Sequence, residues 1–224
     1  CRLFSLMHDC GHGALFSMPF LNKFVGFFIG VLVGVPCYLW ARDHAFHHKT
    51  NGDWESYPGA LEVITVEQYC ALSSRQKTIY RFSKSIFLAP IVGFVYLIFN
   101  PRFIYLFHVV SYIEYHIRKK LPRFKLKCPR PAPVWPRTLT KKEFLHMTLN
   151  NIFFVSLVGL LCFKLGVARF LFPFCFTLSL SGAIIFLLFI SQHNFENSYA
   201  ANKENSDLLK GCLQGTAYLV LPRL

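Results

Sequence analysis

The sequence predicts an all-α, integral membrane helical protein with a transmembrane hairpin, interfacial amphipathic helices and a histidine-rich site on its cytoplasmic face. Of its 224 residues, 54% are apolar and 17% are aromatic, including 25 phenylalanines. Soluble domains seldom have this composition. The apolar residues also collect in runs close to the length of about 20 residues that an α-helix needs to cross a bilayer.

Two histidine clusters lie near the start of the chain. His8 and His12 are four residues apart, and His44, His47 and His48 follow the i, i+3, i+4 spacing. Each cluster can therefore present its imidazoles on one face of a helix. A catalytic zinc site uses about three protein ligands, so this surplus of imidazoles favours two metals. Imidazole suits iron, copper, nickel or zinc, and the spacing does not choose among them.

Geometry argues against a straight membrane span for the apolar segment between the clusters, residues 24–40. As a helix it would measure about 26 Å, which is short for a hydrocarbon core of ~30 Å. A single crossing would also place the two clusters on opposite faces of the membrane. If they share metals, this segment must lie in the interface or dip into the membrane and return. Residues 1–7 are predicted to finish a helix that begins upstream, which would place the first cluster at the membrane surface.

Residues 49–117 are predicted to stay near the membrane surface. Asp53 lies in a polar stretch with turn signals, and it is either a partner of an imidazole or a solvated loop acid. Residues 65–80 are predicted to form one amphipathic helix capped by Thr65. Two apolar stretches, 86–99 and 103–117, are separated by Asn100-Pro101-Arg102, and we expect a shallow hairpin or interfacial segments. His108 and His116, and also His146 further on, are interpreted as packing or hydrogen-bonding residues.

The second half of the chain predicts the membrane orientation. Ten of the 24 lysines and arginines fall within residues 118–142, an extended, proline-containing segment. Beside membrane helices such a segment is a cytoplasmic loop facing anionic lipid, so we expect no nucleic acid partner. Two spans, 146–165 and 170–190, then form an antiparallel hairpin. The second span brings His193 back to the cytoplasmic face, on the side assigned to both clusters.

These motifs resemble those of the membrane fatty acid desaturases of the acyl-lipid type. His8-Asp9-Cys10-Gly11-His12-Gly13 is similar to the first histidine box of that family, and Trp40 through His48 is similar to the second. Residues 61–69, 80–82 and 192–196 are also similar, so the resemblance covers nearly the whole chain. The family's third box, His-x-x-His-His, has no counterpart after His193. We therefore expect residues 1–224 to be a fatty acid desaturase domain truncated at both ends.

The resemblance implies an enzyme that uses O₂ and two electrons to introduce a C=C bond into an acyl chain at a non-haem di-iron centre. It implies an acyl lipid or another acyl substrate, a surrounding lipid membrane and an external electron donor of the ferredoxin or cytochrome type. The implied ligands of the two iron ions are His8, His12, His44, His47, His48 and His193. Carboxylates that are candidates to orient these ligands are Asp9, Asp43, Asp53 and Glu196.

Three alternatives stay open at this point. A related histidine-box hydroxylase or ketolase, acting on alkanes, sterols or carotenoids, would share the same boxes. A membrane zinc hydrolase would use the first cluster, although Asp9 stands where that class has a glutamate. The third alternative is a membrane protein without catalysis. The eight cysteines contain no C-x-x-C pair, and nothing in their pattern requires a disulfide.

Overall fold

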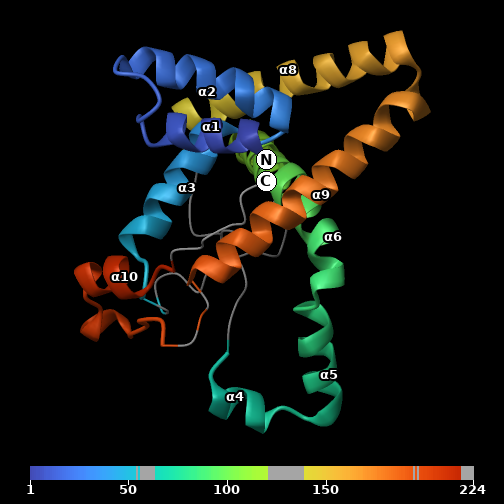
Figure 1. The fold of residues 1–224 in the computed structure, drawn as a ribbon. Coiled ribbons are helices and arrows are strands. Elements are labelled where there is room, and N and C mark those ends of the chain that lie inside the picture. The colour runs from blue at the N-terminus through green and yellow to red at the C-terminus, as the bar shows by residue number, and fades with distance from the viewer. Residues whose placement is uncertain (54, 56–63, 121–138, 194, 196, 218–224) are drawn as a thin grey trace.

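The computed structural model describes residues 1–53, 55, 64–120, 139–193, 195 and 197–217, and these form an all-α protein (Figure 1). Within the described residues there is no strand, only an isolated bridge between Asp53 and Ala201. Among the described residues, three helical stretches are long and apolar enough to cross a membrane: Ile86–Glu114, Lys141–Leu165 and Val167–Gln192. The bent pair Pro19–Val33 and Cys37–Lys49 passes the same test only if it is counted as one span. The all-α prediction is confirmed, and the first of these stretches adds a candidate span to the predicted hairpin.

The N-terminal third consists of α1 (Arg2–Gly11), α2 (Pro19–Val33) and α3 (Cys37–Lys49). The predicted helix around the first cluster is present as α1. Helix α2 ends at Gly34, which takes a left-handed conformation with φ 74°, and α3 then leaves at 101° to α2. Glycine reaches this conformation without the steric cost of a side chain. The apolar segment therefore turns sharply at Gly34. Such a turn is needed if the chain enters the membrane and returns to the same membrane face.

The single helix predicted for residues 65–80 is wrong, because the structure has two. Helix α4 (Val66–Ala71) begins at the predicted Thr65 cap, and α5 (Ser74–Ser83) begins at a second cap, Ser73. The Ser73 side chain accepts a hydrogen bond from the Gln76 N–H, and the Gln76 side chain accepts one from the Ser73 N–H. This second capping box starts a new helix in the middle of the predicted one.

The predicted break at Asn100-Pro101-Arg102 is also wrong. Short helices η1 (Ile86–Leu88), α6 (Ala89–Phe94) and η2 (Val95–Phe99) run directly into α7 (Asn100–Lys120). Proline lacks an N–H and its ring clashes with the carbonyl four residues earlier. Helix η2 is a π-helix, and its wider turn immediately before Pro101 accommodates the ring without ending the helix.

The segment 118–142 was predicted to be extended, but its two ends are helical. Helix α7 continues to Lys120 and α8 (Lys141–Leu165) begins before the segment ends. Residues 121–138 lie outside the described residues. The prediction therefore fails at its boundaries, where the helices include the basic residues 118–120 and 141–142 of the segment.

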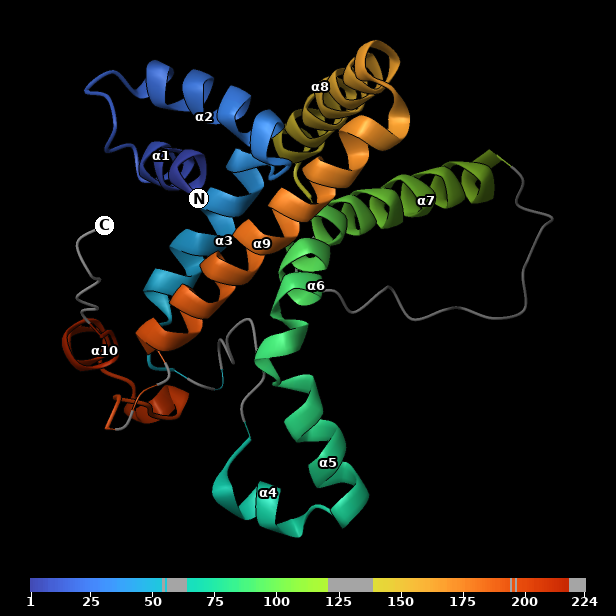
Figure 2. The same ribbon diagram turned by 45° about the vertical axis from the view of Figure 1, so that its right-hand side comes forward.

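The predicted membrane hairpin is confirmed as α8 and α9 (Val167–His193), which meet at Gly166 and diverge from there (Figures 1 and 2). Helix α9 crosses α6 very closely. A Cβ atom added to Gly182 would lie 2.8 Å from the backbone carbon of Gly93, so only glycine fits at this crossing. The chain continues through η3 (Lys203–Asn205) to α10 (Leu208–Gln214), where Asn51 Nδ2 donates to the Gly211 carbonyl at 2.9 Å.

Candidate metal centre

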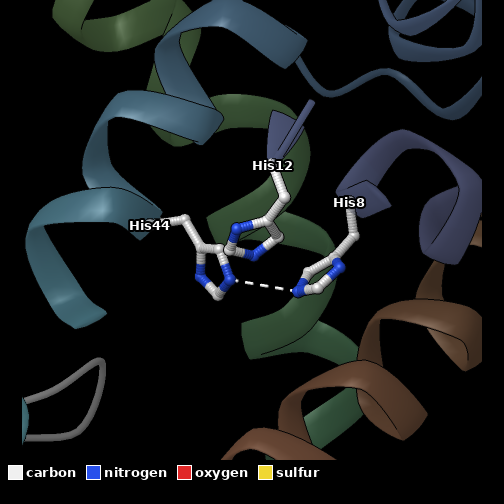
Figure 3. A group of neighbouring side chains, drawn as sticks. All are labelled: His8, His12 and His44. Carbon is white, nitrogen blue, oxygen red and sulfur yellow. Dashed lines mark hydrogen bonds between the residues drawn. The ribbon is translucent and has the colours of Figure 1, made fainter. Parts of the chain in front are cut away.

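The two histidine clusters meet at one place between α1 and α3 (Figure 3). One ring nitrogen each of His8, His12 and His44 lies within 4.8 Å of the others. His44 Nε2 is 3.1 Å from His8 Nε2 and 3.0 Å from His48 Nε2, and only 9% of His44 is exposed. The predicted convergence of the clusters is thus present in the fold for four of the imidazoles.

Small residues and one tryptophan bring α1 this close to α3. A Cβ atom on Gly26 of α2 would lie 2.8 Å from Cys37 Sγ and 3.0 Å from the Cβ of Cys10, so glycine lets the three helices approach. A Cβ atom on Gly11 would come within 3.1 Å of the Trp40 ring. That ring stacks on His44, with centroids 4.4 Å apart. Gly11 lowers the helix propensity of α1, and the tight packing against Trp40 explains why a larger residue would not fit there.

The Asp9 carboxylate lies beside the imidazole of His8. Asp9 Oδ1 is 3.1 Å from His8 Nδ1, and a carboxylate at this distance favours the tautomer with the proton on Nδ1 and a lone pair on Nε2. That lone pair faces His44 Nε2. Partial desolvation and the nearby His8 lower the pKa of His12, so this imidazole stays neutral at a lower pH than an ordinary histidine. Neutral imidazoles that direct nitrogen lone pairs at one spot fit a divalent transition metal.

The other candidate residues have contacts of their own or lie outside the described residues. The His47 ring lies 5.9 Å from that of His44 between centroids, outside the group whose nitrogens converge. Asp43 accepts a hydrogen bond from Arg42, and buried Asp53 accepts one from the Glu55 N–H. The His193 side chain and Glu196 lie outside the described part of the chain. The ligand and orienting roles of these residues stay predictions.

Sequence reasoning missed an ion pair that involves the second histidine box. Arg42 Nη1 donates to Glu143 Oε1 at 2.7 Å, although these residues are 101 positions apart. Glu143 is only 5% exposed. The sequence did contain one signal for Glu143, because Thr140-x-x-Glu143 is the pattern of a capping box at the start of a helix. No local pattern could have named its partner on α3.

The histidines predicted to serve packing or hydrogen bonding do so where the structure describes them. His108 Nε2 accepts a hydrogen bond from the Leu139 N–H at 3.2 Å. The His146 ring packs against Phe27 and Tyr38, with centroids 5.2 and 5.3 Å away. The seven cysteines that the structure describes are free, as expected.

Comparison with known proteins agrees with the site. The sequence model of the family described as fatty acid desaturase matches residues 1–212. The chain belongs to the fatty acid desaturase family. A fatty acid desaturase of Bacillus subtilis (strain 168) is 30% identical over 226 residues, which cover 100% of this chain and 55% of the relative. The chain thus spans about half the length of the relative that it matches throughout.

Plant desaturases are similar to a shorter part of this desaturase chain. The Arabidopsis thaliana acyl-lipid omega-3 desaturase (cytochrome b5) of the endoplasmic reticulum is 39% identical over 54 residues, 24% of this chain and 14% of the relative. The chloroplastic sn-2 acyl-lipid omega-3 desaturase (ferredoxin) of the same plant is 41% identical over 54 residues, 24% of this chain and 12% of the relative. No solved structure matches the chain.

The desaturase chain also contains an apolar cavity of about 410 Å³ at the N-terminal end of α1. It lies among residues of α1, α2, η2 and α9, and its lining includes Phe4 and Ile185. Phe4 is one helical turn before His8. Ile185 is one turn before Phe189, whose ring centroid lies 6.0 Å from that of His44. The cavity therefore ends about one helical turn from the converging imidazoles.

Proposed function

We propose that this desaturase chain binds iron through its histidines and introduces a C=C bond into an acyl chain, using O₂ and two electrons. The convergence of the nitrogens of His8, His12 and His44 within 4.8 Å carries this proposal. It combines with membership of the fatty acid desaturase family over residues 1–212. Residues 1–224 form one desaturase domain in this proposal.

The kind and number of ligand atoms, here imidazole nitrogens, limit which metal and how many ions the chain can hold. His8, His12 and His44 would hold one iron, and His48 lies close enough to His44 to join them. A second iron would use the remaining ligands of the proposal, His47 and His193. The carboxylates proposed to orient the imidazoles are Asp9, Asp43, Asp53 and Glu196. When bound, iron would supply the oxidising power that removal of hydrogen from an unactivated C–H bond requires.

The chain's own residues bind and place the substrate. An acyl chain is apolar and flexible, and the apolar cavity between α1 and α9 would hold it by burial and limit its conformations. Phe189 and Trp40 lie against His44 and reduce the access of water to that side of the site. The position at which the cavity meets the imidazoles would then determine which carbon atoms react.

The membrane arrangement and the electron donor follow from charge and from the relatives. We place the metal site on the cytoplasmic or stromal face of a multi-pass membrane protein, because the basic segment 118–142 precedes α8 at that end. The names of two relatives contain cytochrome b5 and ferredoxin. An external donor of one of these two types would supply the electrons.

The test is expression of the full protein that carries residues 1–224 in a host without polyunsaturated lipids. Fatty acids are analysed by gas chromatography, and iron is measured in the purified protein. New double bonds are expected for the parent and for His108→Ala, and none for His44→Ala. His108 is the matched control because its imidazole lies outside the cluster. An inserted oxygen in place of a double bond would indicate a hydroxylase or ketolase, and zinc in place of iron a hydrolase.

A further inference from the structure

A partly buried ion pair joins the second histidine helix, α3, to the first turn of α8. Arg42 Nη1 lies 2.7 Å from Glu143 Oε1, and the other carboxylate oxygen, Oε2, accepts a hydrogen bond of 2.7 Å from the Thr140 N–H. Glu143 is 5% exposed, so its charge depends on these two partners. Arg42 also pairs with Asp43, at 2.8 Å from Nη2. Both Glu143 oxygens are therefore committed, and the cap of α8 holds the carboxylate in place.

The ion pair lies on the side of α3 that faces away from the metal ligands. Arg42 lies two positions before His44, which corresponds to about 160° around a helix. Helix α3 packs against α1 and also against α8. On one side His44 faces His8 and His12 of α1, and on the other side Arg42 faces Glu143 of α8. A contact at this position determines how α3 is rotated about its own axis.

The rotation of α3 is critical for a metal site. An imidazole nitrogen lies at least ~5–6 Å from the helix axis, so a rotation of ~20° moves it by about 2 Å. Metal–ligand distances tolerate only about 0.2 Å. The aromatic contacts of Trp40 and Phe189 with His44 are less directional than a charge-assisted hydrogen bond. The ion pair is a directional contact between α3 and α8 that can hold α3 within this tolerance.

We propose that Arg42 and Glu143 are positioning residues that set the rotation of α3 and so aim His44 and His48 at the histidines of α1. This inference rests on the proposed metal-binding function and adds residues that touch neither metal nor substrate. The first turn of α8 thereby becomes part of the metal site's support. Outer partners of metal ligands of this kind typically contribute about 10- to 100-fold in metal affinity.

Two substitutions separate the ion pair from the helix cap. Glu143→Gln removes the charge and keeps the capping box, because glutamine occupies the same box position in α4 and α5, as Gln68 and Gln76. Arg42→Gln removes the cation and leaves Glu143 buried without it. Arg81→Gln is the matched control, an identical substitution of an exposed arginine on α5. The double variant Arg42→Gln/Glu143→Gln leaves no unpaired buried carboxylate.

The full chain in detergent is titrated with Co²⁺, and its visible absorption spectrum reports affinity and ligand geometry. Without metal, the rate of diethyl pyrocarbonate labelling of His44 relative to His108 reports the rotation of α3. Arg42→Gln is expected to weaken Co²⁺ binding about tenfold or more, to alter the spectrum and to expose His44 to labelling. Glu143→Gln should have a smaller effect in the same direction, and the double variant should lie closer to the parent than Arg42→Gln does.

The outcomes distinguish this inference from the proposed function. Parent-like Co²⁺ affinity, spectrum and His44 labelling in folded Arg42→Gln would overturn the inference. If Arg42→Gln does not fold, the same three measurements on Glu143→Gln decide it. If the parent binds no Co²⁺ but His44 labelling still rises in the variants, the proposed metal function fails and the positioning role stands. Equal changes in Arg81→Gln would show a general charge effect and reject the inference.

Discussion

Two regions of the molecule are stabilised in opposite ways. One is the α4–α5 segment (residues 65–84). The other is the candidate metal centre with the helices around it, α1, α3 and the first turn of α8, which we call the metal end. At the metal end, contacts join residues that are 30 to 101 positions apart, such as Cys37 with the Met7 carbonyl and Arg42 with Glu143. In the α4–α5 segment, Arg81 Nε donates to the Tyr69 hydroxyl and Lys77 Nζ to the Cys70 carbonyl, over at most 12 positions. The α4–α5 segment also extends away from the other helices in both views (Figures 1 and 2).

The metal end also has a buried core, which the α4–α5 segment lacks. Met7 is fully buried at the metal end, whereas α4 and α5 contain no buried residue. Ile79 and Phe82 share one face of α5 and are 57% and 67% exposed, and α5 ends three residues before the candidate span that begins at Ile86. The comparison teaches that local caps suffice for a surface helix, whereas a metal site needs contacts between distant segments.

The largest effect is expected where two helices touch backbone to backbone. Gly182→Val should cost about 3 kcal/mol or more, because the new side chain would collide with the backbone of Gly93 and neither helix can yield locally. The free energy of unfolding, followed by circular dichroism in detergent, measures this. Gly159→Val is the control, since nothing lies within 4 Å of a Cβ at that α8 position. Equal losses in both variants would show that glycine content, and not the crossing, matters.

Metal binding should stabilise the metal end against local unfolding and leave the stability of the α4–α5 segment unchanged. At a free metal concentration a hundred times the dissociation constant, binding stabilises the folded state by about 2.7 kcal/mol. Hydrogen exchange should therefore slow in α1 and α3, which carry the converging imidazoles, and stay the same in α4 and α5. Removal of the metal with a chelator should reverse the change. Slower exchange across both regions would mean that they are coupled more tightly than their contacts indicate.

Loss of the Ser73 cap should destabilise the α4–α5 segment and leave the metal end unchanged. Ser73→Ala removes the acceptor for the Gln76 N–H and should destabilise α5 by about 1 kcal/mol. Exchange in α5 should accelerate, while Co²⁺ affinity stays at the parent value. Ser74→Ala, one residue further along, is the control because the Ser74 side chain does not cap the helix. A change of metal affinity in Ser73→Ala would contradict the independence of the two regions.

The smallest effect is expected at the Arg81–Tyr69 contact. The Arg81 guanidinium lies 5.8 Å from the Tyr69 ring centroid and is exposed. Arg81→Gln should cost at most about 0.5–1 kcal/mol, the usual range for an exposed cation–π contact. Tyr69→Phe keeps the ring and removes the hydroxyl, so a thermal unfolding comparison separates the two parts of the contact. A loss above 2 kcal/mol in either variant would mean that the α4–α5 segment has a wider structural role.

Local chemistry made most of the helices predictable, and the errors also have local causes. Long apolar runs predicted α8 and α9, and Thr65 predicted the start of α4. The Ser73 and Gln76 box was visible in the sequence, but the helical pattern on both sides concealed it. Pro101 predicts a break in the helix, but the π turn of η2 immediately before it accommodates the proline ring.

The sequence by itself determined which residues are candidate metal ligands and where most of the helices form, because histidine spacing, caps and apolar runs act over a few residues. Only the tertiary structure decided that the two clusters meet and that His44 and His48, more than His47, turn toward α1. It also selected Glu143 as the partner of Arg42 and Gly93 as the partner of Gly182. Helix rotation and helix–helix distance depend on contacts between residues far apart in the chain, and no local pattern encodes them.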